Sequence, residues 1–129
     1  KDGKFVLGKR QNTGWRDGYY QMPAGHVDAG ELPSEAAIRE AKEEVGVTIA
    51  PGDLKFVHIS FRTKHDETGD RVDYYFETER WEGEVHNAEP HKCSELVWVS
   101  PDSLPEHIVP NTKYVIEALL RGEMFSELR

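Results

Sequence analysis

The sequence is poor in cysteine, in long apolar runs and in basic residues, and each shortage excludes a class of protein. Its single cysteine, Cys93, rules out an internal disulfide and a CxxC metal or redox pair, so we expect a reducing, cytoplasmic environment. No apolar run approaches the roughly 18 residues of a membrane-spanning helix. Lys and Arg number 16 against 24 Asp and Glu, giving a net charge of −8, which disfavours binding to a nucleic-acid polymer.

The remaining composition is that of one globular domain. The chain has 129 residues, of which 37% are hydrophobic and 31% charged, and no repeat or low-complexity tract divides it. We therefore expect a single domain over residues 1–129. Asp2-Gly3 ahead of an apolar run is typical of a hairpin turn, and a hairpin needs a strand before its turn, so we expect that a short N-terminal strand is lacking. The sequence leaves the oligomeric state open, a homodimer included.

Predicted strands and helices follow one another along the chain, which indicates an α/β or α+β fold. Alternating or continuous apolar segments predict strands over residues 4–10, 19–22, 54–64, 71–79 and 95–100. Helical spacing of apolar residues predicts helices over residues 35–45 and 111–121. We expect Ser34 to be the N-cap of the first helix and Gly46 to end it.

The first predicted helix carries three glutamates on one face. Glu40, Glu43 and Glu44 are spaced i, i+3 and i+4, and like charges so placed repel by about 0.2–0.5 kcal/mol per pair in an exposed helix. One interpretation is a solvated acidic face that Arg39 and Lys42 partly neutralise. The other is a site for Mg²⁺ or Mn²⁺, hard cations that bind carboxylate and carbonyl oxygens.

The residues around these glutamates decide between the two interpretations. Gly25 is followed after five residues by Glu31, and after seven more by residues 39–47, Arg-Glu-Ala-Lys-Glu-Glu-Val-Gly-Val. This spacing matches the Nudix box, GX5EX7REUXEEXGU, in which U is a bulky aliphatic residue, and departs from it only at Ala41, which is small for a U position. The chain therefore resembles the Nudix hydrolases. The resemblance implies their α/β/α sandwich, with a mixed β-sheet between helices.

The resemblance also implies an activity and a set of functional residues. Nudix hydrolases cleave a nucleoside diphosphate linked to another group, with Mg²⁺ as the cofactor and Mn²⁺ as a substitute. The implied metal ligands are the carbonyl of Gly25 and the carboxylates of Glu40, Glu43 and Glu44. Glu40 or Glu44 would accept the proton of the attacking water, and we favour Glu40 because MutT-like enzymes use that position.

Two further residues of the box have supporting roles in this interpretation. Arg39 would orient the neighbouring carboxylates, because its fixed fork of donors can hold the second oxygen of a ligand. Glu31 would contact the metal or substrate directly or through water, or else only brace the loop.

Within the family, the chain looks most like the MutT-type nucleoside triphosphate pyrophosphohydrolases. The stretch Trp81-Glu82-Gly83-Glu84 follows a predicted strand, as in those enzymes, where the last Glu reaches the metal. Glu84 is thus a candidate ligand or an exposed loop acid. Arg10 is a candidate phosphate contact or an ordinary strand residue, and Asn111 a candidate nucleobase contact or a helix N-cap. The expected reaction converts a nucleoside triphosphate, oxidised ones included, to the monophosphate and pyrophosphate.

Two functions of other classes stay open at this point. A domain of the same fold could bind a nucleotide or metabolite as a sensor without turning it over, although a binding-only domain has no need to hold three like charges together. An acidic helix that docks a protein partner would bind indifferently to Mg²⁺ and would be suppressed by salt. The favoured partner remains a small-molecule nucleotide substrate.

Overall fold

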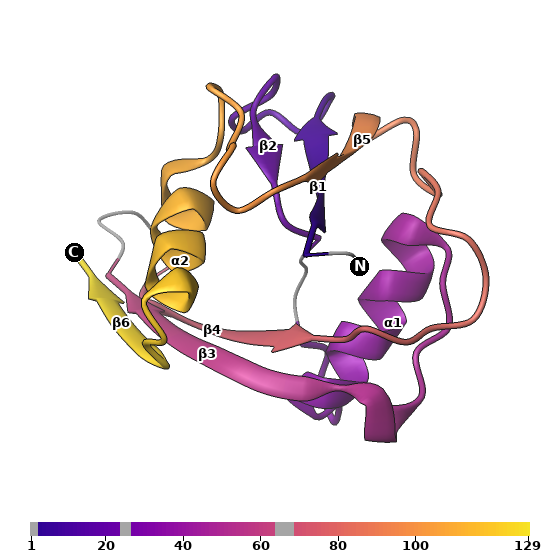
Figure 1. Ribbon diagram of the computed structural model, residues 1–129, viewed down its shortest axis with the longest axis horizontal. Helices are drawn as coiled ribbons and strands as arrows, with labels where there is room; N and C mark the ends of the chain where they lie inside the picture. The colour runs from indigo at the N-terminus through magenta and orange to yellow at the C-terminus, as the bar shows by residue number, and fades with distance from the viewer. Residues whose placement is uncertain (1–2, 24–26, 64–68) are drawn as a thin grey trace.

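The computed structural model describes residues 3–23, 27–63 and 69–129, which form two three-stranded sheets and two α-helices (Figure 1). The first sheet is antiparallel and has the order β2-β1-β5, with β1 at Phe5–Arg10, β2 at Tyr20–Gln21 and β5 at Cys93–Val99. In the second, β3 (Lys55–Arg62) pairs antiparallel with β4 (Arg71–Glu77) and parallel with β6 (Phe125–Leu128). The predicted mixed α/β architecture is confirmed.

The two helices flank the space between the sheets. In Figure 1, α1 (Pro33–Val45) lies on the right and α2 (Pro110–Leu120) on the left, while a short 3-10 helix, η1 (Pro51–Asp53), precedes β3. Neither α-helix of the described part of the chain has the length and apolar character that crossing a membrane requires. The strand expected ahead of Asp2 lies outside the described residues.

The N-terminus of α1 differs from the prediction. Ser34 is the second residue of the helix and not its N-cap, because the helix begins at Pro33 after the N-cap residue Leu32. Proline suits the first helical position, where its missing N–H would have no partner within the helix. The Glu35 carboxylate accepts a hydrogen bond from the Leu32 N–H at 2.8 Å, which is the half of a capping box that a glutamate at the third helical position supplies.

The C-terminus of α1 is fixed by Gly46, as predicted. Gly46 has φ +74°, and its N–H donates to the Lys42 carbonyl at 3.2 Å. A Cβ at this position would lie 1.9 Å from the Cε1 atom of His86, so the segment after β4 packs directly against the helix end. The His86 N–H also donates to the Val45 carbonyl at 3.0 Å. This contact holds the segment before β5 beside the last turn of α1.

The hydrophobic core attaches α1 to the first sheet. Val45, Val47 and Ile49 are buried together, and the partly buried side chains of Val6 and Leu96 pack against them. Because Val6 lies on β1 and Leu96 on β5, this cluster fixes the last turn of α1 against the face of that sheet. A second cluster, around Leu7, Ile108 and Ile116, joins the same sheet to α2.

β6 was not predicted from the sequence. Besides the main-chain pairing with β3, its contacts include His58, which is fully buried. The His58 ring nitrogens lie 2.9 Å from the Glu123 carbonyl and 2.8 Å from the Ser126 hydroxyl, so one side chain joins the end of the chain to β3. Asn111 was also misplaced as a cap, since α2 begins at Pro110 and its N-cap residue is Val109.

Candidate active site

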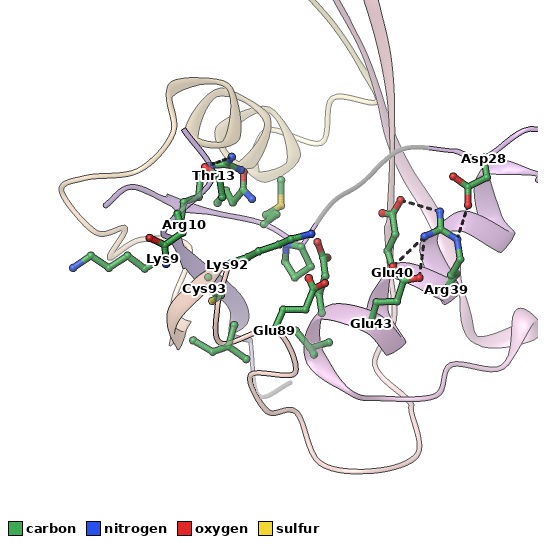
Figure 2. A pocket seen from close by; sticks show the side chains of 18 residues that line it. Lys9, Arg10, Thr13, Asp28, Arg39, Glu40, Glu43, Glu89, Lys92 and Cys93 are labelled. Atoms are coloured by element: carbon green, nitrogen blue, oxygen red, sulfur yellow. Dashed lines mark hydrogen bonds and ion pairs between the residues drawn. The ribbon is translucent and has the colours of Figure 1, made fainter. Parts of the chain in front are cut away.

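A cavity of about 680 Å³ lies between the first sheet and α1 (Figure 2). Its lining residues come from β1 and the loop after it, from β2 and the connection to α1, from α1, and from the segment that leads into β5: Gly8, Lys9, Arg10, Asn12, Thr13, Gln21, Met22, Pro23, Asp28, Arg39, Glu40, Glu43, Glu44, Val45, Glu89, Lys92, Cys93 and Leu96. Carboxylates gather on the α1 side, and basic side chains extend from the sheet side (Figure 2).

The three glutamates predicted on one helical face all line this cavity. The Glu40 side chain is 12% exposed, whereas that of Glu43 is 52% exposed. Burial raises the pKa of Glu40 to about 7, because desolvation penalises the carboxylate; Arg39 opposes the rise, and the charges of Glu31 and Glu43 add to it. Without a bound cation, Glu40 therefore exchanges its proton near neutral pH.

Arg39 joins the carboxylates of the loop to those of the helix. Its guanidinium donates to both carboxylate oxygens of Glu31, at 2.8 and 3.0 Å, and its Nη1 lies 3.1 Å from Glu43 Oε2. These contacts, with a hydrogen bond from the Asp28 N–H, lower the pKa of Glu31 to about 2. Glu31 is absent from the cavity lining, so the contacts seen for Glu31 are those of a residue that braces the loop.

Two residues that the sequence analysis missed, Glu89 and Lys92, also line the cavity. They lie in the turn before β5, where the Cys93 N–H donates to the Glu89 carbonyl at 3.0 Å. The Ala88 N–H donates to the Glu44 carbonyl at 3.1 Å, which brings Glu89 to the end of α1. Apolar residues have neither helical nor alternating spacing in this turn. The one sign of it in the sequence is Glu89 followed by a proline.

Of the three remaining predicted site residues that the structure describes, only Arg10 lines the cavity. Glu84 is exposed and lies outside the cavity lining. Arg10 lines the cavity, but its guanidinium donates to the Trp15 carbonyl at 2.7 Å. Asn111 lies outside the lining, at the start of α2, where its Nδ2 donates to the Tyr75 hydroxyl at 3.4 Å. Gly25 lies outside the described residues.

The cavity offers donors for a hard cation without enclosing a finished site. Among residues 3–23, 27–63 and 69–129, no three His, Cys, Asp or Glu side chains converge closely enough to hold a metal ion. Glu40 Oε1 is buried, accepts no hydrogen bond from a described residue, and has its ion-pair partner, Arg39 Nη2, at 3.6 Å. A buried carboxylate oxygen beside other carboxylates suits Mg²⁺ or Mn²⁺, so the residues present fit such an ion.

Known proteins resemble this chain in sequence and in structure. The family profile described as NUDIX domain matches residues 1–119. The 8-oxo-dGTP diphosphatase of Escherichia coli K12 is 32% identical over 104 residues, covering 78% of this chain and 74% of that protein. The RNA pyrophosphohydrolase of Erythrobacter litoralis is 29% identical over 125 residues, covering 81% and 73%. The crystal structure of a MutT NUDIX hydrolase from Burkholderia pseudomallei superposes with a TM-score of 0.80 at 25% identity, covering 91% of this chain and 88% of that one.

Proposed function

The chain belongs to the Nudix hydrolase family, and from this premise we propose that it hydrolyses nucleoside triphosphates, oxidised ones included, to nucleoside monophosphates and pyrophosphate in the presence of Mg²⁺. The observation that carries the proposal is that Glu40, Glu43 and Glu44 all line one cavity, of about 680 Å³. A cavity of this size accommodates a nucleotide. Mn²⁺ serves as a substitute for Mg²⁺ in the proposal.

In this proposal the metal ion would be held by Glu40, Glu43 and Glu44 of α1 and by Glu89 of the turn before β5, all of which line the cavity. The resemblance to the family adds the carbonyl of Gly25. When bound, the divalent cation supplies charge neutralisation at the phosphate oxygens and lowers the pKa of nearby water. Arg39 keeps Glu43 and Glu31 in place through the hydrogen bonds described above.

The chain itself supplies the base. Water attacks the α- or the β-phosphorus of the triphosphate. The bond from that phosphorus to the oxygen bridging the two breaks, and the products are the monophosphate and pyrophosphate. The proton of the water passes to a carboxylate, for which Glu40 and Glu44 are the candidates. Glu40 is favoured, because MutT-like enzymes, which the chain resembles, use this position of the box and because the Glu40 side chain is only 12% exposed.

A small nucleotide suits the molecule better than a nucleic-acid polymer. The net charge of −8 gives no long-range attraction for a polyanion, and several cavity-lining groups are themselves carboxylates. We therefore expect free nucleoside triphosphates to be hydrolysed faster than a 5′-triphosphorylated RNA oligonucleotide.

The test is product analysis after incubation with a panel of compounds in Mg²⁺. The panel holds canonical and oxidised nucleoside triphosphates, ADP-ribose, a dinucleoside polyphosphate, a sugar nucleotide and the 5′-triphosphorylated oligonucleotide. Pyrophosphate and a monophosphate from the free triphosphates support the proposal. Orthophosphate as the first product, or cleavage of the oligonucleotide alone, contradicts it.

Two pairs of variants test the assigned residues. Glu43→Lys abolishes turnover while circular dichroism shows an intact fold, and Glu117→Lys, the same charge change on the exposed surface of α2, retains activity. If Glu40 is the base, Glu40→Gln lowers kcat by about 10²-fold or more relative to the parent, and by a larger factor than Glu44→Gln does. The opposite order assigns the proton to Glu44.

A further inference from the structure

Three basic residues line the sheet side of the cavity, and two of them are directed elsewhere. Lys9 points away from the cavity in Figure 2, and its Nζ lies 5.8 Å from the centre of the Tyr20 ring. The Arg10 guanidinium turns toward the loop after β1 and lies 4.9 Å from the centre of the Trp15 ring. Neither cation is presented to the middle of the cavity.

Lys92 is placed differently. Figure 2 shows its side chain extended from the β5 side across the cavity toward α1. Both polar atoms of its main chain are bonded, since its N–H donates to the Glu89 carbonyl and its carbonyl accepts from the Gln11 N–H, each at 2.9 Å. Within the part of the chain that the structure describes, no carboxylate forms an ion pair with Lys92.

The turn that carries Lys92 is fastened on both sides. On the α1 side, the Ala88 N–H donates to the Glu44 carbonyl at 3.1 Å. On the other side, Asn12 Nδ2 donates to the His91 carbonyl at 3.0 Å. The separation between the base of the Lys92 side chain and the acidic wall is therefore set by hydrogen bonds to two other segments.

This placement defines a second contact for an anionic substrate. A polyphosphate held by cations on the α1 side leaves its other oxygens facing the sheet side. Lysine offers a positive charge and three donors to such oxygens. We infer that Lys92 binds the phosphate oxygens that face away from α1, an inference that rests on the proposed function and assigns the substrate a diphosphate or longer group.

A competing explanation is that Lys92 only offsets the charge of the neighbouring carboxylates. The two explanations differ in what the removal of the ammonium group weakens. A phosphate contact governs the affinity for phosphate at saturating metal. A purely compensating charge governs the affinity for metal, which would tighten on its removal because the carboxylates would lose a competing cation.

The test compares Lys92→Met with Lys9→Met, which removes the same charge from the neighbouring strand. Inorganic pyrophosphate is titrated calorimetrically into each full-length variant in excess Mg²⁺, and Mn²⁺ is titrated into each without phosphate. We expect Lys92→Met to weaken pyrophosphate binding by about 10-fold or more, as the loss of a charge-assisted hydrogen bond does, and Lys9→Met to stay within about 2-fold of the parent. Equal pyrophosphate affinities for the three proteins, with or without tighter Mn²⁺ binding by Lys92→Met, would overturn the inference. So would the absence of pyrophosphate binding by the parent.

Kinetics separate this inference from the proposed function. With a nucleoside triphosphate that the parent hydrolyses, Lys92→Met raises KM by a similar factor with little change in kcat, and Lys92→Arg restores most of the loss. A parent that hydrolyses nothing in the panel yet loses pyrophosphate affinity on Lys92→Met contradicts the proposed function only. A parent that is active, with KM unchanged in Lys92→Met, contradicts the inference only.

Discussion

At the scale of single residues, the Glu40 carboxyl group couples the cavity to pH. Burial raises its pKa to about 7, so a metal ion must displace a proton from it below neutrality. We expect the Kd for Mn²⁺ to rise by up to about 10-fold for each pH unit below 7 and to level off above pH 8. Titration of Mn²⁺ at pH 6, 7 and 8 measures this, with Glu117→Gln as a control that keeps the dependence. A Kd that does not vary between pH 6 and 8 contradicts it.

The same shift has a consequence for stability. The folded chain retains a proton on Glu40 that the unfolded chain releases above about pH 4.5, so the free energy of unfolding of the metal-free protein falls as pH rises from about 4.5 to 7. Bound Mg²⁺ removes this loss, because the ionised carboxylate then has a partner. Thermal melts in EDTA and in Mg²⁺ should therefore diverge as pH rises through this range, and parallel melting curves would contradict the assignment.

Glu31 behaves in the opposite way. Hydrogen bonds from Arg39 and the Asp28 N–H lower its pKa to about 2, so its stabilising contribution is complete above about pH 4.5 and is lost as pH falls toward 2. We expect Glu31→Gln to reduce Tm at pH 6 and to flatten the decline of Tm between pH 4.5 and 2. Glu77→Gln, which alters an exposed ion pair on β4, should keep the parent profile. An unchanged acid limb in Glu31→Gln would show that the Arg39 contact does not stabilise the fold.

The candidate site could be predicted where its residues share one helix. Glu40, Glu43 and Glu44 have a fixed spacing on α1, so the sequence alone brought them to one face. Glu89 and Lys92 could not be found in this way. Their position depends on hydrogen bonds from a loop to the end of α1 and to the segment after β1, and no periodicity records such contacts.

At the scale of elements, the junction between α1 and the segment before β5 positions the site. Gly46 has a left-handed φ of +74°, and an added Cβ would lie 1.9 Å from the His86 ring. Gly122, after α2, has a similar φ of +75° with nothing within 4 Å of an added Cβ. We expect Gly122→Ala to cost about 1–2 kcal/mol from backbone strain alone, and Gly46→Ala to cost more because it adds the clash. Urea unfolding measures both free energies.

A double variant isolates the clash at this junction. His86→Ala should recover part of the loss in the Gly46→Ala background, because it removes the atoms that the added methyl group meets. Gly46→Ala should also lower activity beyond its effect on stability, since Glu89 lies on the displaced segment. Strictly additive effects of the two substitutions would show that the helix end and the segment are not coupled.

Among the helices and strands, the long ones could be predicted and the short strand and the helix starts could not. The helices and the long strands followed from periodicity, because each buries one face along its length. β6 is only four residues long, too short for periodicity to reveal, and the contacts of His58 with Glu123 and Ser126 join residues more than 60 positions apart. The N-caps of both helices were misplaced because a proline, at position 33 or 110, supplied the first helical residue in place of a side-chain cap.

At the scale of the whole molecule, a second hollow, of about 730 Å³, lies near the first and differs from it in chemistry. Its lining is mostly apolar and includes Val72, Tyr74 and Phe76 of β4, the end of α2 and the stacked pair Trp81 and Trp98. Several of these side chains are far from buried: Val72 is 48% exposed, Tyr74 47% and Leu120 58%. The fold thus has an acidic cavity, which suits phosphate and metal, and beside it this second hollow, an apolar groove that remains open to solvent.

We expect this open groove to bind an apolar dye in the native protein. An apolar dye such as 8-anilinonaphthalene-1-sulfonate should bind it and fluoresce without denaturant, because the groove offers apolar surface accessible to a small aromatic molecule. Leu120→Glu should reduce the fluorescence, since it places a carboxylate in the lining and repels the sulfonate. Met124→Glu is the matched control, because Met124 is equally exposed at 58% but lies outside the groove. Equal fluorescence from the two variants would place the dye elsewhere, and no fluorescence from the parent would mean that the groove is covered in solution.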